Sequence, residues 1–148
     1  MRFFQEIAYN RVLLATAVAW FVAQALKVPS FYLIERKWKL SRIFELGGMP
    51  SSHACSVCAL AISVGIASGF NSASFAICCL LAAIVMTDAA GVRRAAGKQA
   101  QLLNRIVQDL FENGRGFNYE SLKELLGHSP FEVLIGALLG VLIGFLIM

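Results

Sequence analysis

Four apolar segments dominate this chain and restrict the environments in which it can fold. They cover residues 12–26, about 54–70, about 75–87 and 131–148. Each has about 13 to 18 residues, at or just below the roughly 17 to 25 that cross a bilayer as a helix. Flanking residues can lengthen two of them, the first into the start of 28–34 and the third to 72–88. The pattern indicates a chain that spans a membrane several times.

The composition of the chain leads to the same conclusion. It is 58% hydrophobic and 15% charged, whereas ordinary globular proteins carry about 25% charged residues. A domain of 148 residues cannot bury so much apolar surface in its own interior. We therefore predict an all-α integral membrane bundle of about four transmembrane helices. It is expected to form one domain over residues 1–148, with a basic helix and loop region on the cytoplasmic side.

The distribution of cations predicts how the bundle lies in the membrane. A short turn at residues 69–72 makes the middle two segments an antiparallel hairpin, so the polar segments 27–53 and 88–130 share one face. These hold eleven of the thirteen lysines and arginines. The positive-inside rule then predicts that both are cytoplasmic, although cations that bind a phosphorylated ligand would give the same bias. Residues 1–10 lack the features of a removable signal, so the first segment is expected to be retained.

Two further patterns are better explained by packing than by chemistry. The four cysteines, at positions 55, 58, 78 and 79, all lie in apolar segments, where free cysteine behaves as a small hydrophobic residue. Gly136, Gly140 and Gly144 recur at every fourth position of the last segment, which places them on one helix face. That face is expected to pack closely, either inside the bundle or between two copies in a homodimer. No metal or cofactor motif is present in the sequence.

Both histidines of the chain stand immediately before an apolar segment. His53 closes the stretch Gly-Gly-Met-Pro-Ser-Ser-His, and His128 opens the stretch His-Ser-Pro-Phe-Glu. The N-terminus of a helix favours an anion because its N–H groups lack partners and its dipole is positive. Ser51 and Ser52 can cap the second segment and donate hydroxyl hydrogens, and Ser129 before a proline is typical of a helix start. These stretches are candidate anion sites.

Glu132 follows His128 by four positions, so a helix would place both side chains on one face. A carboxylate there can bind one imidazole nitrogen and leave the other free to attack, as in covalent catalysis by a nucleophile with an orienting partner. The alternative interpretation is that the histidines only mark the membrane interface and that Glu132 is a solvated acid at a helix start.

Charged residues between the two histidines are the remaining candidates. The sequence predicts a helix over 92–110 with a basic face, in which Arg94 and Lys98 lie one turn apart and can face one site. An alternative role for these cations is attraction to anionic lipid. Asp88 ends the third segment, where an acid is costly unless it is paired or wet, and this makes it a functional candidate. An ordinary interfacial helix end remains the alternative.

The two histidine stretches resemble motifs of the superfamily of type 2 phosphatidic acid phosphatases and vanadium haloperoxidases. The stretch ending at His53 is similar to its Pro-Ser-Gly-His motif, and His128 with Glu132 is similar to its third motif. Nearly the whole chain is identified as a member of the divergent branch, a group of small bacterial and plant membrane proteins. This resemblance implies a bacterial inner membrane or a plastid membrane.

The resemblance also implies a metal-independent mechanism without a cofactor. His128 would attack phosphorus to form a phosphohistidine, with Glu132 in place of an orienting aspartate. His53 would protonate the leaving oxygen, and Ser51 and Ser52 would hold phosphate oxygens. The first motif of the superfamily, Lys-x6-Arg-Pro, is absent before residue 47, and leucine stands at 122 where arginine is usual. Candidate replacement cations are Arg93, Arg94, Lys98 and Lys123.

The sequence therefore predicts a phosphatase that acts on a lipid phosphate or diphosphate. The main alternative is a non-catalytic protein that binds anionic lipid or serves assembly and keeps the same fold. A transporter or channel subunit and a haloperoxidase are weaker alternatives. Nucleic acid is not an expected partner, because the basic residues lie beside membrane segments.

Overall fold

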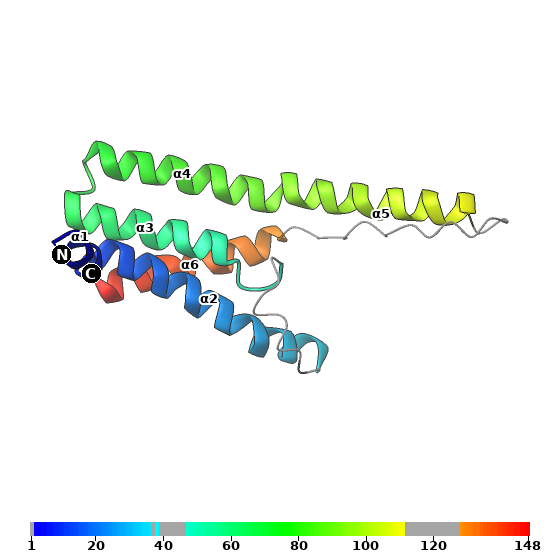
Figure 1. Cartoon of the computed structure of the whole chain (residues 1–148), viewed down its shortest axis with the longest axis horizontal. Coiled ribbons are helices and arrows are strands. Elements are labelled where there is room, and N and C mark those ends of the chain that lie inside the picture. The colour runs from blue at the N-terminus through cyan, green and yellow to red at the C-terminus, as the bar shows by residue number, and fades with distance from the viewer. Residues whose placement is uncertain (1, 37, 39–46, 112–127) are drawn as a thin grey trace.

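The protein is all-helical in the part of the chain that its computed structural model describes, residues 2–36, 38, 47–111 and 128–148. These residues form six helices and no strand, so the predicted all-α class is confirmed (Figure 1). The helices are α1 (Arg2–Ala8), α2 (Arg11–Glu35), α3 (Ser52–Ser68), α4 (Ala73–Ala90), α5 (Val92–Phe111) and α6 (Pro130–Ile147).

Three helical stretches are long and apolar enough to cross a membrane, and one of them runs through both α4 and α5. The apolar stretches are residues 11–33 of α2, residues 73–108 of α4 with α5, and residues 130–147 of α6, while α3 is a shorter apolar helix. Large apolar side chains on α4 and α6 point outward, among them Leu80, Ile84, Leu138 and Leu142. Hydrocarbon is a suitable surrounding for such a surface. The predicted integral membrane bundle is thus confirmed as the fold class.

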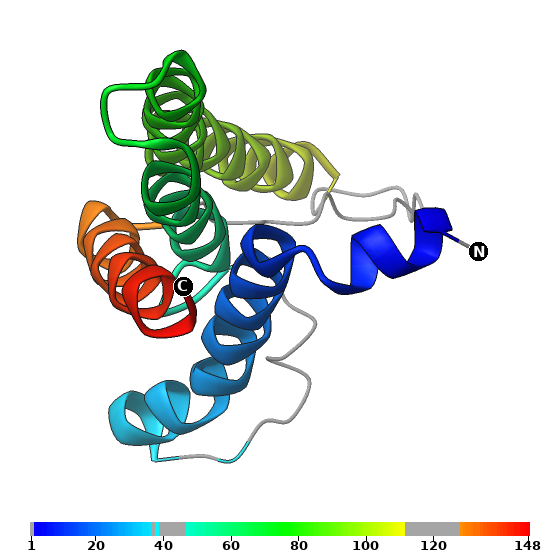
Figure 2. The same cartoon turned by 90° about the vertical axis from the view of Figure 1, so that its left-hand side faces the viewer.

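Helix α3 lies at the centre of the bundle, between α2, α4 and α6 (Figure 2). Small side chains fill the contact between α2 and α3, with Ala19 and Ala23 on one side and Cys55 and Ala59 on the other. Small residues allow helix backbones to approach closely, which is how helices associate where both are surrounded by lipid. Cys55 thus serves as core packing, and its thiol donates to the carbonyl oxygen of Ala19 at 3.3 Å.

The glycine face of α6 packs against α3 of the same chain. A Cβ atom on Gly136 would collide with the carbonyl oxygen of Ser51, and one on Gly140 with that of Cys55. The sequence left open whether this face packs inside the bundle or against a second copy, and in the structure it packs inside the bundle. A homodimer through the same three glycines would need a surface that α3 already occupies.

Helix α2 is longer than the apolar segment 12–26 from which the first span was predicted. The sequence predicted that flanking residues extend the first span into the start of 28–34, and it counted Lys27 with the polar segment 27–53. In the structure, α2 continues through Pro29 to Glu35, and Lys27 is only 2% exposed. The predicted extension beyond residue 26 is thus present, and Lys27 lies inside the apolar helix rather than in a polar segment.

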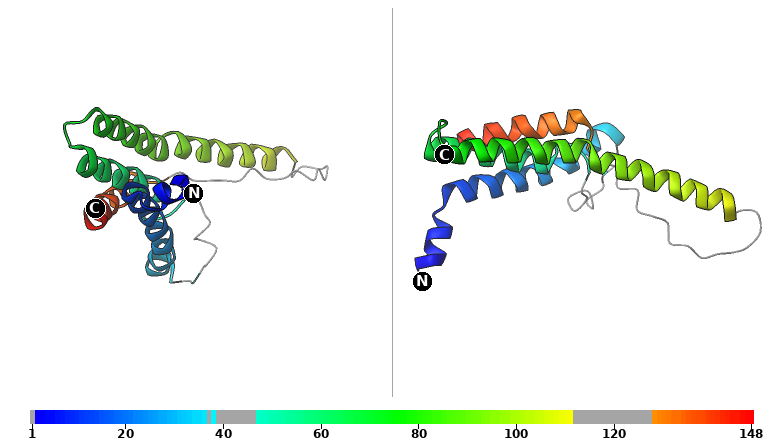
Figure 3. Two further views of the ribbon diagram at one scale, coloured as in Figure 1. Left: turned by 60° about the vertical axis from the view of Figure 1, so that its left-hand side comes forward. Right: turned by 90° about the horizontal axis from the view of Figure 1, so that it is seen from above.

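Helix α5 follows α4 after the single residue Gly91, whose N–H donates to the carbonyl oxygen of Thr87 at 2.8 Å. It extends beyond the bundle in much the same direction as α4 (Figures 1 and 3). The predicted helix over 92–110, continuing the third span, is confirmed. At the other end of the molecule, α1 turns away from the bundle before Asn10, which caps α2 by accepting from the N–H of Leu13.

Candidate active site

Two helix N-termini come together at one end of the bundle. Helices α3 and α6 run parallel, because Gly136 lies against Ser51 and Gly140 against Cys55. Helix α2 runs the opposite way, since Arg11 at its start donates to the carbonyl oxygen of Ile147 at the end of α6, at 2.9 Å. The C-terminal ends of α2 and α4 therefore lie at the same end as the N-termini of α3 and α6 (Figure 1).

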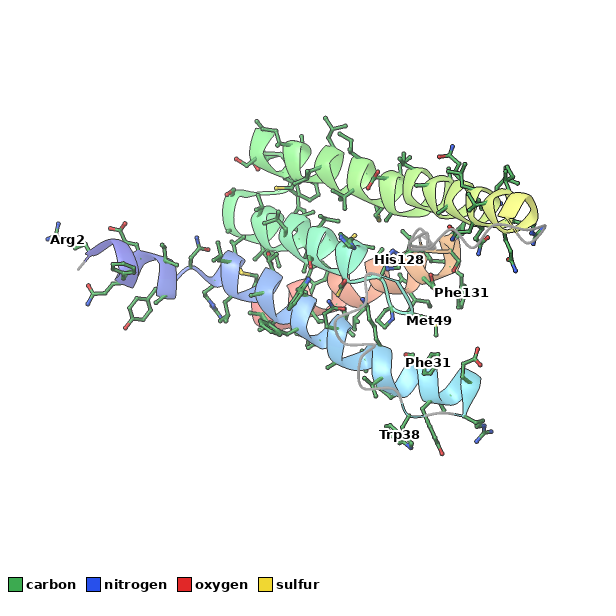
Figure 4. All side chains as sticks on the ribbon, turned by 45° about the vertical axis from the view of Figure 1, so that its right-hand side comes forward. Arg2, Phe31, Trp38, Met49, His128 and Phe131 are labelled. Carbon is green, nitrogen blue, oxygen red and sulfur yellow. The ribbon has the colours of Figure 1, made fainter. Side chains whose placement is uncertain are left out.

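The two histidines meet at this end. The ring centroids of His53 and His128 are 5.8 Å apart, and the ring planes make an angle of 72°. His128 is almost fully buried, at 1% exposure, and His53 is half-buried. Figure 4 shows His128 at the start of α6, on the same side of the bundle as Met49, which belongs to the loop before α3. The fold thus brings together the two histidines singled out in the sequence.

The loop before α3 contains a glycine with a positive φ and ends at a serine cap. Gly48 has a φ of +94°, a value that residues other than glycine rarely adopt. Ser51 caps α3, accepting from the N–H of Ala54 at 3.4 Å, and its own N–H donates to the carbonyl oxygen of Glu132 at 3.1 Å. Ser51 and Ser52, both predicted phosphate ligands, are buried. One backbone bond therefore ties the two histidine stretches together.

The start of α6 is a capping box, which is a reciprocal pair of hydrogen bonds between the N-cap and the third residue of a helix. The Ser129 hydroxyl accepts from the N–H of Glu132 at 3.3 Å, and Oε2 of Glu132 accepts from the N–H of Ser129 at 2.7 Å. Glu132 was predicted to orient His128. In the structure, its carboxylate accepts from the N–H of Ser129 and so stabilises the turn that follows His128.

Helix α4 joins the site through its last turn. The N–H of His128 donates to the carbonyl oxygen of Ala89 at 3.2 Å. Asp88, the preceding residue, is half-buried, and it lies at a helix C-terminus, where the dipole disfavours a negative charge. This unfavourable placement beside the histidine loop keeps Asp88 a functional candidate.

Of the four predicted cations, the structure describes the side chain of Lys98 alone, and this side chain lies away from the histidine pair. Lys98 is exposed on the part of α5 that leaves the bundle, about 15 Å along the helix from Asp88. Arg93 and Arg94 lie in the first turn of α5, but the structure does not describe their side chains. Lys123 is outside the described residues.

One further charged residue lies at this end, Lys27, which the sequence analysis counted among the cations of the polar segment 27–53 without giving it a role in the site. Ala15, Ala19 and Ala23 occur at every fourth position before it, and all four residues are buried. Positions with that spacing share a helix face. The spacing of the three alanines in the sequence therefore indicates that Lys27 belongs to the buried face of α2.

Fold and site define a multi-pass helical membrane protein with two histidines beside converging helix N-termini. Residues 8–143 match the sequence model of the Divergent PAP2 family, and the chain belongs to that family, as the histidine stretches predicted. It is also similar to the uncharacterized membrane protein YuiD of Bacillus subtilis (strain 168). The two are 41% identical over 148 residues, covering 93% of this chain and 94% of that protein. No solved structure matches the chain.

Proposed function

We propose that this protein is a metal-independent phosphatase that hydrolyses a lipid phosphate or diphosphate through a phosphohistidine intermediate. The observation that carries the proposal is the meeting of His53 and His128, 5.8 Å apart, at the end where α3 and α6 begin. The family assignment supports it, since its name relates the chain to phosphatidic acid phosphatases.

In the proposed reaction, one ring nitrogen of His128 attacks phosphorus while the bond from phosphorus to the leaving oxygen breaks. His53 donates a proton to that oxygen, and the lipid leaves as an alcohol or a monophosphate. Water then attacks the phosphohistidine, His53 takes up a proton from the water, and phosphate leaves His128. General acid–base help of this kind contributes about 10²- to 10⁴-fold to a rate.

Charge on the phosphoryl oxygens needs fixed positive groups, because it spreads over all three equatorial oxygens in the transition state. The N-termini of α3 and α6 each contribute the equivalent of roughly half a positive charge. Ser51 and Ser52 are the proposed hydroxyl donors. Arg93, Arg94, Lys98 and Lys123 remain candidate cations, and Asp88 a candidate partner for one of them or for a histidine.

A lipid substrate fits the position of the site better than a soluble one. The histidines lie at the end of membrane-spanning helices, which is the level of lipid head groups. Phe131 begins α6 beside His128 and is 61% exposed (Figure 4). An exposed aromatic ring at this level suits the boundary between head groups and acyl chains.

A second candidate function is the binding of an anionic lipid without hydrolysis. The specific observations in its favour are the capping role of Glu132 and the exposed position of Lys98. Among the described residues, Glu132 and Lys98, which were predicted to take part in catalysis and phosphate binding, therefore have no hydrogen bond or ion pair with the histidine pair.

The test is phosphate release by the purified full chain in detergent, with phosphatidic acid and a lipid diphosphate as substrates. We expect release by the wild type, inhibition by vanadate, and a fall of at least about 10³-fold in His128→Asn, which removes the nucleophile. Cys79→Ala is the control, because Cys79 is exposed on α4. Binding of phosphatidic acid without any release would favour the non-catalytic candidate. Activity that persists in a folded His128→Asn protein would remove His128 as the nucleophile.

A further inference from the structure

Lys27 is the one buried cation among the lysines and arginines whose side chains the structure describes. It is 2% exposed and lies within residues 11–33 of α2, the stretch apolar enough to span a membrane. Burial of an ammonium group carries a large desolvation cost. A charged residue inside a membrane segment is therefore a functional candidate by default.

The packing of α2 places Lys27 at the level of the histidine site. The thiol of Cys55 donates to the carbonyl oxygen of Ala19, so these two residues are level with each other on antiparallel helices. Lys27 lies about 12 Å beyond Ala19 along α2, and Ser51 lies about 6 Å before Cys55 along α3. Helical side chains lean toward the N-terminus of their own helix. The long side chain of Lys27 therefore leans back toward the level of Ser51.

Three positive groups lie at this level, and two carboxylates, Asp88 at the end of α4 and Glu132 in the cap of α6, lie at the same end of the bundle. The N-termini of α3 and α6 are positive ends of helix dipoles, and the ammonium of Lys27 adds a full positive charge beside them. An anion is the group that the three positive groups stabilise most. A phosphoryl group matches them, because several oxygens can be bound at once.

Gln24 supplies an independent observation from the same helix. It is 8% exposed, and its Oε1 atom has no hydrogen-bond partner among the described residues. It lies about one turn before Lys27, on the same side of α2. A buried acceptor without a donor is unfavourable, and a hydroxyl on a ligand, such as the P–OH of a phosphate monoester, would supply the donor. This buried corner is suited to a polar ligand.

We propose that Lys27 and Gln24 form the α2 side of the phosphoryl-binding site, where Lys27 binds phosphate oxygens and Gln24 accepts from a ligand hydroxyl. The proposal rests on the proposed location of the substrate at His53 and His128. The recognised chemistry is a phosphoryl group, whether it belongs to a lipid head group or to a free phosphate. Lys27 would then supply the cation that the sequence lacks at the usual motif positions.

The test is the affinity of the purified full chain for two probes, measured by titration calorimetry without turnover. One probe is inorganic phosphate, and the other is the non-hydrolysable phosphonate analogue of phosphatidic acid in mixed micelles, with phosphatidylcholine micelles as the blank. The variant is Lys27→Met, which keeps the length of the side chain and removes the buried charge, a change that folded proteins often tolerate. Arg105→Met is the matched control, since it removes one charge from an exposed position of α5.

We expect Lys27→Met to bind the phosphonate analogue of phosphatidic acid about 10- to 100-fold more weakly than the wild type, as for the loss of a hydrogen bond to a charged group. Arg105→Met should bind like the wild type. Equal weakening with inorganic phosphate assigns the contact to the phosphoryl group alone, and weakening with the lipid only assigns it to the lipid head group. Gln24→Leu, which removes the acceptor, should weaken binding as well, and it keeps the proposal testable if Lys27→Met does not fold.

Wild-type affinity of folded Lys27→Met for both probes would overturn the proposal. Failure of the wild type to bind either probe would overturn it too. Phosphate binding by the wild type without phosphate release would contradict the phosphatase and leave the role of Lys27 standing.

Discussion

Glu132 occupies the first turn of α6, where a carboxylate can serve the helix, the neighbouring histidine or both. Its Oε2 atom accepts from the N–H of Ser129 at 2.7 Å, so the side chain fixes the turn between His128 and the helix. The position of the His128 ring therefore depends on a cap as well as on the burial of the ring itself. A change in the cap of α6 should therefore also change the position of the proposed nucleophile.

Substitutions of Glu132 separate these two roles. Glutamine can also fill the third position of a capping box, so we expect Glu132→Gln to keep most of the stability and most of the phosphate release. Glu132→Ala removes the cap and should cost about 0.3–1.5 kcal/mol of stability. Thermal unfolding in detergent and phosphate release measure the two effects. A folded but inactive Glu132→Gln protein would show that the negative charge acts directly on His128.

Among the helices, the parallel pair of α3 and α6 determines where the site forms. The close approach of Gly136 to Ser51 and of Gly140 to Cys55 aligns the starts of the two helices, and with them the two histidines. The register of two helices thus controls the distance between two rings that are far apart in the sequence.

Substitution at the glycine face tests this register. Gly140→Ala would place a Cβ atom against the carbonyl oxygen of Cys55, with the Cα of Cys55 only 2.9 Å away. Backbone atoms cannot rotate aside, so α6 must shift, at a cost of about 1–3 kcal/mol as for other overpacked cores. We expect a lower unfolding temperature together with weaker phosphate binding. Leu138→Ala, on the exposed face of α6, should change neither, and an unchanged Gly140→Ala protein would contradict this packing.

The sequence predicts the helices because their signals are local, and it indicates the two histidines because both stretches resemble motifs of one superfamily. Apolar runs define α2, α3, α4 and α6, and serine or asparagine caps mark where helices begin. The burial of Lys27 is not local, since it depends on which face of α2 packs against α3 and α6. The same is true of Lys98, which the sequence placed near the site, because its position depends on the direction in which α5 leaves the bundle. Helix α1 was not predicted, and its short sequence has no strong apolar period.

At the scale of the whole molecule, the bundle has two different ends. One end carries the histidine site, and the other carries the turn between α3 and α4 together with the start of α2 and the end of α6 (Figure 1). If the bundle spans a membrane, these ends lie on opposite sides of it. The distribution of lysines and arginines predicts that the site faces the cytoplasm.

Single-cysteine labelling tests this orientation. In a variant in which Cys55, Cys58, Cys78 and Cys79 are replaced by alanine, new cysteines are introduced as Asn71→Cys or Gln101→Cys, both at exposed positions. We expect an impermeant maleimide to label Asn71→Cys in intact bacterial cells, and Gln101→Cys only after permeabilisation. The reverse pattern would invert the orientation. Labelling of both from one side would contradict the hairpin of α3 and α4.

The central claim is that His128 carries the phosphoryl group during the reaction. The most direct measurement is mass-spectrometric mapping of the wild-type protein and His128→Asn after brief reaction with phosphatidic acid and quenching in base, which preserves phosphohistidine. The account predicts a phosphoryl group on the wild-type peptide that contains His128, and none at that position in the variant. Release of phosphate by the wild type with no phosphoryl group on His128, or with one on another residue, would contradict it.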